Sequence, residues 1–186
     1  MIRKHIKSLY VFDRDDTLFQ TTARAKVTND EGKVKYLNSR ELKNFTIKDD
    51  ENISFKEFKD SKKFVTESQP IKPMIKTAQD CIKKTADGSK TILLTARSDL
   101  DCKELFLEYL NSSGLDVTRI YVERAGNLMG LKTAEAKKFI ISKYLESYKY
   151  QAVFLFDDSK ENIDSFLRLK HFYPKISFYT KLVKTN

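Results

Sequence analysis

Short, largely apolar runs alternate with stretches of helical periodicity along most of this chain, and this alternation constrains the fold more than any other feature of the sequence. From Pro73 onward the expected order is helix, strand, helix, strand, helix, strand, helix, strand. Apolar strands that alternate with helices are typical of a parallel sheet covered on both faces. We therefore predict an α/β fold with right-handed crossovers. The expected strands are Leu9–Phe12, Thr91–Leu94, Arg119–Val122, Ala152–Phe156 and Ile176–Tyr179.

The expected helices cover 73–87, 99–110, 133–147 and 161–169. The first begins at a proline and is stopped by Gly88. In the third, Thr133 is a suitable N-cap, and Ala136, Phe139, Ile140 and Tyr144 fall on one side, which predicts the packed face of that helix.

The segment from Gln20 to Pro70 departs from this pattern. Two short runs, Lys26–Thr28 and Lys33–Tyr36, flank the turn-forming residues 29–32 and predict an exposed β-hairpin. The remainder is very polar, but a structureless surface loop of about 50 residues is improbable in a compact domain. We predict a core of residues 1–19 and 71–186 and a small insertion, 20–70, over one end of the sheet.

The charge balance bears on the partners of the protein. The 186 residues include 35 Lys and Arg against 26 Asp and Glu, a net charge of +9. Such a balance favours an anionic partner, nucleic acid being the most common, although scattered lysines fit a merely solvated surface equally well. The sequence sets no oligomeric state.

No apolar run approaches the ~18–20 residues that a membrane span requires. The apolar run that follows the basic residues near the N-terminus is short and is ended by the charge of Asp13. We therefore expect neither a membrane partner nor an export signal. Cys81 and Cys102 form no disulfide framework, and we expect buried thiols in a reducing cytoplasm.

Three of the predicted strands end in polar residues that suit one reaction. The first runs into Asp13 and Asp15, and a nearly extended backbone aims both carboxylates to the same side. One carboxylate can attack phosphorus, while the other protonates the leaving oxygen and then activates water. The alternative is an acidic turn that caps a helix through Asp16 or Thr17.

The strand at 91–94 ends in Thr95, Ala96 and Arg97. A hydroxyl followed by free backbone N–H groups can bind a phosphoryl oxygen, and Arg97 can add a charged fork. An ordinary N-cap before the next helix is the alternative.

The strand at 152–156 ends in Asp157 and Asp158, which repel each other unless a cation or a proton intervenes. Oxygen ligands suit Mg²⁺, which also holds substrate phosphate, whereas helix capping explains one acid but not two. A fixed cation beside the phosphate can come from Lys132, Lys137 or Lys138.

Together these residues resemble the motifs of the haloacid dehalogenase (HAD) superfamily of phosphohydrolases. The DxDxT motif of that family matches residues 13–17, its Thr matches Thr95, and its acidic pair matches Asp157 and Asp158. Its lysine, about 20 residues before the acidic pair, matches Lys137, with Lys138 nearly as well placed. The resemblance covers residues 9–19 and 73–169. The chain is also similar to small stand-alone phosphatases of large phages and to the phosphatase part of polynucleotide kinase-phosphatases.

The resemblance implies a Rossmann-like core in which the insertion is a small cap, and it implies roles for the motif residues. Asp13 is then the nucleophile and Asp15 the general acid and base. Mg²⁺ is held by Asp13, the backbone carbonyl of Asp15 and Asp158, with Asp157 behind them or as a further ligand. The phosphoryl group is bound by Thr95, the residues that follow it, and a lysine. Lys137 is the expected lysine, with Lys138 the main rival.

The expected function is that of a Mg²⁺-dependent phosphomonoester hydrolase that acts through an aspartyl-phosphate. An acid at Asp15 favours a phosphatase over a dehalogenase, and the small insertion disfavours a mutase. The expected substrate is a nucleotide or a nucleic-acid end. A sugar-phosphate phosphatase and a catalytically silent binding module are the alternatives.

Overall fold

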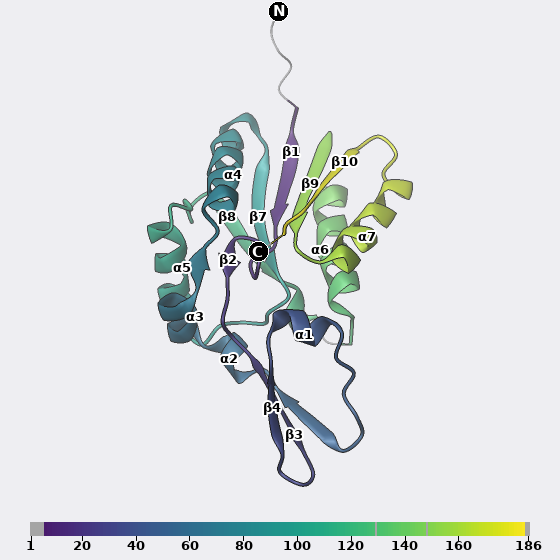
Figure 1. Cartoon of the computed structure of the whole chain (residues 1–186). Helices are drawn as coiled ribbons and strands as arrows, with labels where there is room; N and C mark the ends of the chain where they lie inside the picture. Colours follow the sequence, from purple (N-terminus) through teal and green to yellow (C-terminus); the bar gives the residue numbers. More distant parts are fainter. Residues whose placement is uncertain (1–5, 129, 148, 185–186) are drawn as a thin grey trace, which may run out of the picture.

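The computed structural model describes residues 6–128, 130–147 and 149–184 (Figure 1). At its centre is a five-stranded sheet in the order β10-β9-β1-β7-β8, in which every neighbouring pair is parallel. The predicted α/β fold with a parallel sheet is confirmed. The strands are β1 (Ser8–Phe12), β7 (Lys90–Thr95), β8 (Ile120–Arg124), β9 (Ala152–Asp157) and β10 (Ser177–Leu182).

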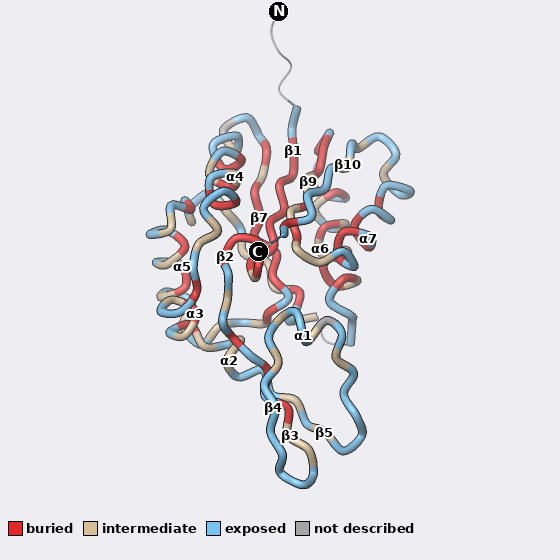
Figure 2. Tube along the Cα trace, viewed as in Figure 1, coloured by how far each residue is buried: buried red, intermediate tan, exposed pale blue. Residues whose placement is uncertain are grey.

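Helices cover both faces of this sheet. Alternate residues of β1 face opposite sides, so Tyr10 and Phe12 belong to one apolar cluster and Leu9 and Val11 to the other. The first cluster includes residues of α4 and α5, and the second includes residues of α6 and α7. Figure 2 shows the buried residues concentrated along β1, β7 and β9. The helices are α4 (Lys72–Lys83), α5 (Lys103–Ser112), α6 (Thr133–Ser147) and α7 (Lys160–Leu167), with short 3₁₀ turns η1 (Lys84–Asp87), η2 (Ala125–Asn127) and η3 (Arg168–His171).

Two sequence expectations for these helices are wrong. Helix α5 begins at Lys103, not at Asp99, because Asp101 accepts a hydrogen bond from the backbone N–H of Ser61 at 2.8 Å and its own N–H donates to Lys59. Cys102 precedes this helix and is half-buried, whereas Cys81 is buried as expected. Burial raises the pKa of the Cys81 thiol to about 11.

The packed face of α6 also differs from the prediction. Phe139 is 45% exposed, and the buried residues are Ala134, Ala136, Lys137, Ile141 and Leu145. Four of these lie three or four positions apart and form one stripe along the helix. Lys137 lies within that stripe and not at its edge. An apolar pattern cannot reveal this, because a lysine is normally assigned to the solvent side.

The segment 20–70 has secondary structure of its own. The chain leaves the core through β2 (Phe19–Gln20) and returns through β6 (Gln69–Pro70), which pair antiparallel. Between them β3 (Ala25–Asn29) pairs with β4 (Val34–Leu37), where the sequence predicts a hairpin, and also with β5 (Glu51–Ser54). Short helices complete the segment: α1 (Ser39–Lys43), α2 (Lys56–Lys59) and α3 (Ser61–Glu67).

The parts of this segment pack differently. Phe64 of α3 is buried and contacts Phe19, Phe106 and Tyr109, so α3 belongs to the packing of the main core. The three-stranded sheet and α1, in contrast, project beyond the carboxyl ends of the central strands (Figure 1). The division into a core of 1–19 and 71–186 and an insertion of 20–70 stays a prediction.

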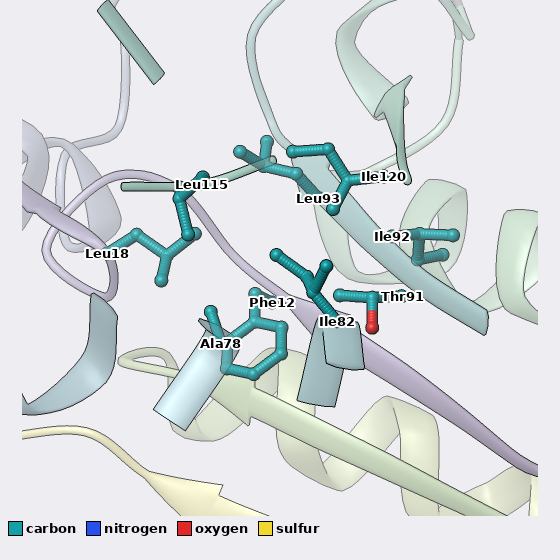
Figure 3. A pocket seen from close by; sticks show the side chains of 9 residues that line it. All are labelled: Phe12, Leu18, Ala78, Ile82, Thr91, Ile92, Leu93, Leu115 and Ile120. Atoms are coloured by element: carbon teal, nitrogen blue, oxygen red, sulfur yellow. The ribbon is translucent and has the colours of Figure 1, made fainter. Parts of the chain in front are cut away.

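A small cavity lies between α4 and the central sheet (Figure 3). Its volume is about 10 Å³, and apart from Thr91 its lining side chains are apolar. Within the described ranges the Thr91 hydroxyl has no hydrogen-bond partner. A water needs two or more polar partners, so this cavity is a packing gap rather than a ligand site.

In the same ranges, no helix is long and apolar enough to cross a membrane.

Candidate active site

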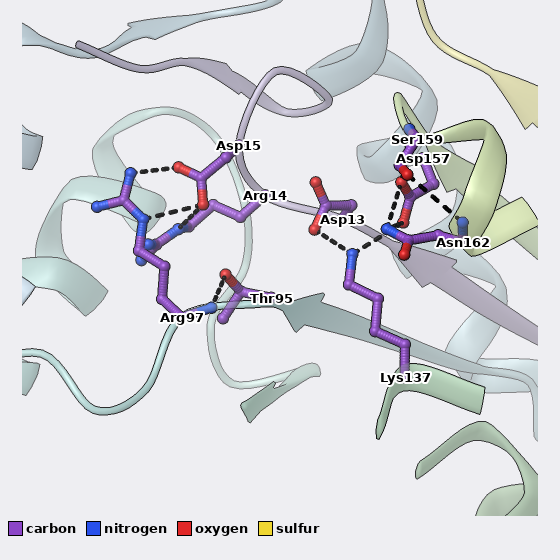
Figure 4. A network of polar contacts seen from close by, with 9 residues as sticks. All are labelled: Asp13, Arg14, Asp15, Thr95, Arg97, Lys137, Asp157, Ser159 and Asn162. Carbon is purple, nitrogen blue, oxygen red and sulfur yellow. Dashed lines mark hydrogen bonds and ion pairs between the residues drawn. The ribbon is translucent and has the colours of Figure 1, made fainter. Parts of the chain in front are cut away.

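The predicted polar residues meet at the carboxyl ends of three neighbouring strands (Figure 4). The register pairs Phe12 of β1 with Phe156 of β9 and Leu93 of β7, so the residues that follow these strands lie side by side. The N–H of Asp13 continues the ladder by donating to the carbonyl of Phe156 at 2.9 Å. Ligands of open parallel sheets bind at this edge.

Lys137 joins two of the acidic residues. Its Nζ lies 2.6 Å from Oδ1 of Asp13 and 2.8 Å from Oδ2 of Asp157, and all three side chains are buried. The neighbouring Lys138 instead pairs with Glu135 on the surface of the helix. Of the three candidate lysines, the structure thus brings Lys137 to the acids and leaves Lys138 outside, while Lys132 lines the same cleft.

The electrostatics of this cluster leave room for a further positive charge, either a proton or a cation. Burial raises the pKa of Asp13 to about 8; Lys137 opposes this shift, and the nearby carboxylates of Asp157, Asp15 and Asp158 add to it. Burial lowers the pKa of Lys137, but the charges of Asp13 and Asp157 outweigh it and hold that pKa above its usual value. One buried lysine therefore faces a group of carboxylates that it does not neutralise alone.

The two adjacent acids at the end of β9 differ in their surroundings. Asp157 is 0% exposed and accepts hydrogen bonds from the N–H of Ser159 at 2.9 Å and from Nδ2 of Asn162 at 2.9 and 3.0 Å. Asp158 is half-buried and lines the cleft. Carboxylate oxygens of Asp13, Asp157 and Asp158 lie within 4.8 Å of one another, a spacing at which they could share a metal ion. The sequence reasoning missed Asn162; its place in the first turn of α7 was the available signal.

Asp15 lies in the same cleft but has other partners than Asp13 (Figure 4). Arg97 contacts both of its oxygens, with Nε at 3.0 Å from Oδ2, and Nε of Arg14 lies 3.3 Å from the same oxygen. Burial works against ionisation of Asp15, but the charges of Arg14 and Arg97 outweigh it and hold its pKa well below the usual range. In this arrangement Asp15 is a carboxylate without a proton to donate.

Arg14, between the two aspartates, is itself buried. Its guanidinium lies over the rings of Phe64 and Phe106, at 4.8 and 5.4 Å from their centres. Among the described residues, its Nη2 has no hydrogen-bond partner. Burial lowers the pKa of Arg14 to about 10, against the opposing charge of Asp15. Arg14 thus holds Asp15 from the core side, a role the sequence reasoning did not assign to it.

The chain reverses directly after Asp15. Asp16 adopts a positive φ of 57°, in the left-handed region that non-glycine residues seldom occupy. Its N–H donates to the carbonyl of Phe19 at 2.7 Å, while the N–H groups of Leu18 and Phe19 both donate to the carbonyl of Arg14. This closed turn fixes the direction in which Asp15 leaves the backbone.

The loop after β7 contributes unevenly. The Thr95 hydroxyl is buried and accepts a hydrogen bond from the N–H of Arg97 at 3.2 Å, and Thr95 is not part of the cleft lining. Ala96 and Arg97 do line it. Gly126 of η2 packs so closely that a Cβ there would lie 2.4 Å from the carbonyl oxygen of Ala96. A glycine at this place lets the loop sit against η2.

Asp13, Asp15, Arg97, Lys137 and Asp158 line one side of a cleft of about 1090 Å³. Its opposite wall comes from the segment 20–70, whose α1 and α2 lie beyond the carboxyl ends of the strands. Comparison of the chain with protein-family models and with curated proteins found no match.

Proposed function

We propose that this protein is a Mg²⁺-dependent phosphomonoester hydrolase of the HAD type. The observation that carries the proposal is the buried Asp13–Lys137–Asp157 cluster beside the half-buried Asp158, at the ends of adjacent parallel strands. A nucleophile, a fixed cation and carboxylates that could bind a metal ion are the three things that phosphoryl transfer from an anionic ester requires. The motif resemblance described above supports the same reading.

The donor set fits Mg²⁺. All three acidic side chains offer oxygen, and Lys137 leaves their charge partly uncompensated. Asp13, the backbone carbonyl of Asp15 and Asp158 would hold the ion, while Asp157, saturated by Lys137, Ser159 and Asn162, would keep the lysine in place. A bound Mg²⁺ would offset the charge of the phosphate and of the oxygens around it.

The chain's own residues can carry out both halves of the reaction. A carboxylate oxygen of Asp13 forms a bond to phosphorus while the bond from phosphorus to the ester oxygen breaks. Asp15, which must first take up a proton from solvent, supplies that proton to the ester oxygen. Water then attacks phosphorus, Asp15 takes a proton from it, and inorganic phosphate and free Asp13 are formed. Lys137 and Arg97 neutralise the oxygens of the transferring group.

The ion pair between Asp15 and Arg97 sets a condition on this sequence. Arg14 and Arg97 together keep Asp15 ionised, so Asp15 can act as an acid only after this hold is weakened, and of the two Arg97 is the one that lines the cleft. A substrate phosphate offers Arg97 a second anionic partner at the same place. We infer that substrate binding and activation of Asp15 are linked through Arg97.

Turnover of p-nitrophenyl phosphate tests the proposal. We expect hydrolysis with Mg²⁺, loss of hydrolysis with EDTA, and recovery when Mg²⁺ is restored in excess. Absence of turnover under every divalent ion would favour the alternative of a silent binding module. Substrates are expected among nucleotides and nucleic-acid ends, with sugar phosphates as the competing class.

Substitutions of the two adjacent acids at the end of β9 should differ in their effect on the Mg²⁺ dependence of turnover. Asp158→Ala is expected to raise the Mg²⁺ concentration for half-maximal turnover by about tenfold or more, since it removes a ligand. Asp157→Ala should instead lower the free energy of unfolding, because Lys137 then keeps only Asp13 as a buried partner and Nδ2 of Asn162 loses its buried acceptor. Turnover titrations and urea denaturation of both variants provide the measurement. Equal Mg²⁺ titrations would contradict the assignment of Asp158.

A further inference from the structure

We propose that three phenylalanines of the segment 20–70 form a binding wall for a nucleobase, so that the substrate is a phosphomonoester of a nucleoside. This inference rests on the proposed phosphatase function and names the substrate class of the same site. Phe45, Phe55 and Phe58 all line the cleft that contains Asp13. We call these three residues the phenylalanine wall.

The placement of these rings is unusual for their surroundings. The outer part of the segment is mostly polar, yet the phenylalanine wall turns to the cleft instead of forming a closed core. Phe55 is 46% exposed, and Phe45 and Phe58 are half-buried. Exposed apolar groups that gather in a cleft are typical of ligand contact. Phe55 and Phe58 meet edge to face, with ring centres 5.9 Å apart.

The wall lies next to the groups that would handle phosphate. The guanidinium of Arg97 is 4.7 Å from the ring centre of Phe58, and its Nη1 donates to the Phe58 carbonyl at 3.1 Å. The same Arg97 donates to Asp15 through Nε at 3.0 Å. A phosphate bound at Arg97 therefore has the wall within reach of its ester group.

The chemistry of the wall selects a flat ring over a bare sugar. Aromatic faces stack on nucleobases without regard to sequence. The charged groups of the cleft cannot make this selection alone, because its lining contains as many acidic as basic side chains. A volume of about 1090 Å³ exceeds what a phosphate needs and is sufficient for a nucleotide. Lys59 and Lys132, also in the lining, can meet further phosphates of a strand.

The test compares adenosine 5′-monophosphate with ribose 5-phosphate, which lacks the base. We expect the wild-type protein to favour the nucleotide in kcat/KM by about tenfold or more. Phe55→Ala and Phe45→Ala should lower the ratio of the two kcat/KM values by roughly fivefold or more, the usual size of one stacking contact. Phe172→Ala is the matched control, since this ring is 71% exposed and lies outside the cleft, and it should leave the ratio unchanged.

Calorimetric titration of the same variants with both compounds measures binding at the phenylalanine wall independently of turnover. Tighter binding of the nucleotide that is lost in Phe55→Ala supports the wall even if hydrolysis fails. Preference for ribose 5-phosphate, or ratios that do not change in either cleft variant, would overturn it. Failure to hydrolyse any of these phosphomonoesters with Mg²⁺, while the preference in binding is kept, overturns the phosphatase proposal alone.

Two further substrates identify the source of the nucleoside phosphate. Single-stranded oligonucleotides with a 3′- or a 5′-phosphate are compared with the mononucleotide at two salt concentrations. Faster turnover of an oligonucleotide, with a steep loss as salt rises, supports a strand end. Faster turnover of the mononucleotide with a shallow salt dependence supports a free nucleotide.

Discussion

Asp13→Asn should abolish turnover and leave the fold intact. The amide cannot form the acyl phosphate, and the loss of a nucleophile costs orders of magnitude in rate, so we expect a fall of at least about a thousandfold. The fold should survive because the amide oxygen keeps an acceptor 2.6 Å from Lys137, and Asp157 continues to balance the lysine charge. Single-turnover assays and circular dichroism provide the measurements.

Deamidation would restore the aspartate, so the variant is checked by mass spectrometry before assay. Asp16→Asn is a useful companion, since Asp16 lies three positions along the chain and its backbone, not its carboxylate, forms the turn. Activity of Asp13→Asn above about a tenth of the wild-type rate would show that Asp13 is not the nucleophile.

Lys137→Ala should have the second large effect, on both activity and stability. The substitution leaves Asp13 and Asp157 buried without the cation between them, and breaking a buried pair from one side usually costs about 3–5 kcal/mol. Turnover should fall as well, because the transferring phosphoryl group loses a fixed positive charge. Urea denaturation and kcat at saturating Mg²⁺ measure the two effects.

Lys138→Ala is the matched control. The two lysines are neighbours on α6, but Lys138 pairs with Glu135 at a partly exposed position on the helix surface, where such pairs contribute about 1 kcal/mol or less. Both readouts should stay near wild type. Loss of activity in Lys138→Ala together with full activity in Lys137→Ala would reverse the assignment.

The central sheet could be predicted because apolar runs and helical periodicity report burial directly. Residues 9–12 and 152–156 needed only small adjustments at their ends. The errors arise where tertiary contacts override the local pattern. Residues 99–102 fit a helix, but the hydrogen bonds between Asp101 and Ser61 draw them out of it. The pairing of β5 with β3 joins residues more than twenty positions apart and has no signal in either stretch.

The candidate site shows the same division. The acids of the first and last motifs sit at strand ends, so the sheet itself brings them together, and this could be expected from topology. The burial of Lys137 could not be expected from the sequence, since only the completed cluster compensates its charge. Arg14 and Asn162 act by holding other side chains. The place of Asn162 in the first turn of α7 is a signal, whereas nothing in the spacing of Arg14 marks it. The ion pair of Asp15 with Arg97 likewise appears only once β1 and β7 lie side by side.

The position of β1 in the middle of the sheet has a consequence for how the protein folds. At the start of this strand, the N–H of Ser8 donates to Ser89 just before β7, which lies 81 positions further along the chain. The N–H of the preceding Lys7 donates to Gln151 just before β9, 144 positions further along. At usual rates of synthesis, the second of these appears on the order of ten seconds after β1. Pairings of such long range also make folding slow. The apolar strand that leads to Asp13 therefore has no partner in the central sheet until β7 appears, when about half of the chain has been made.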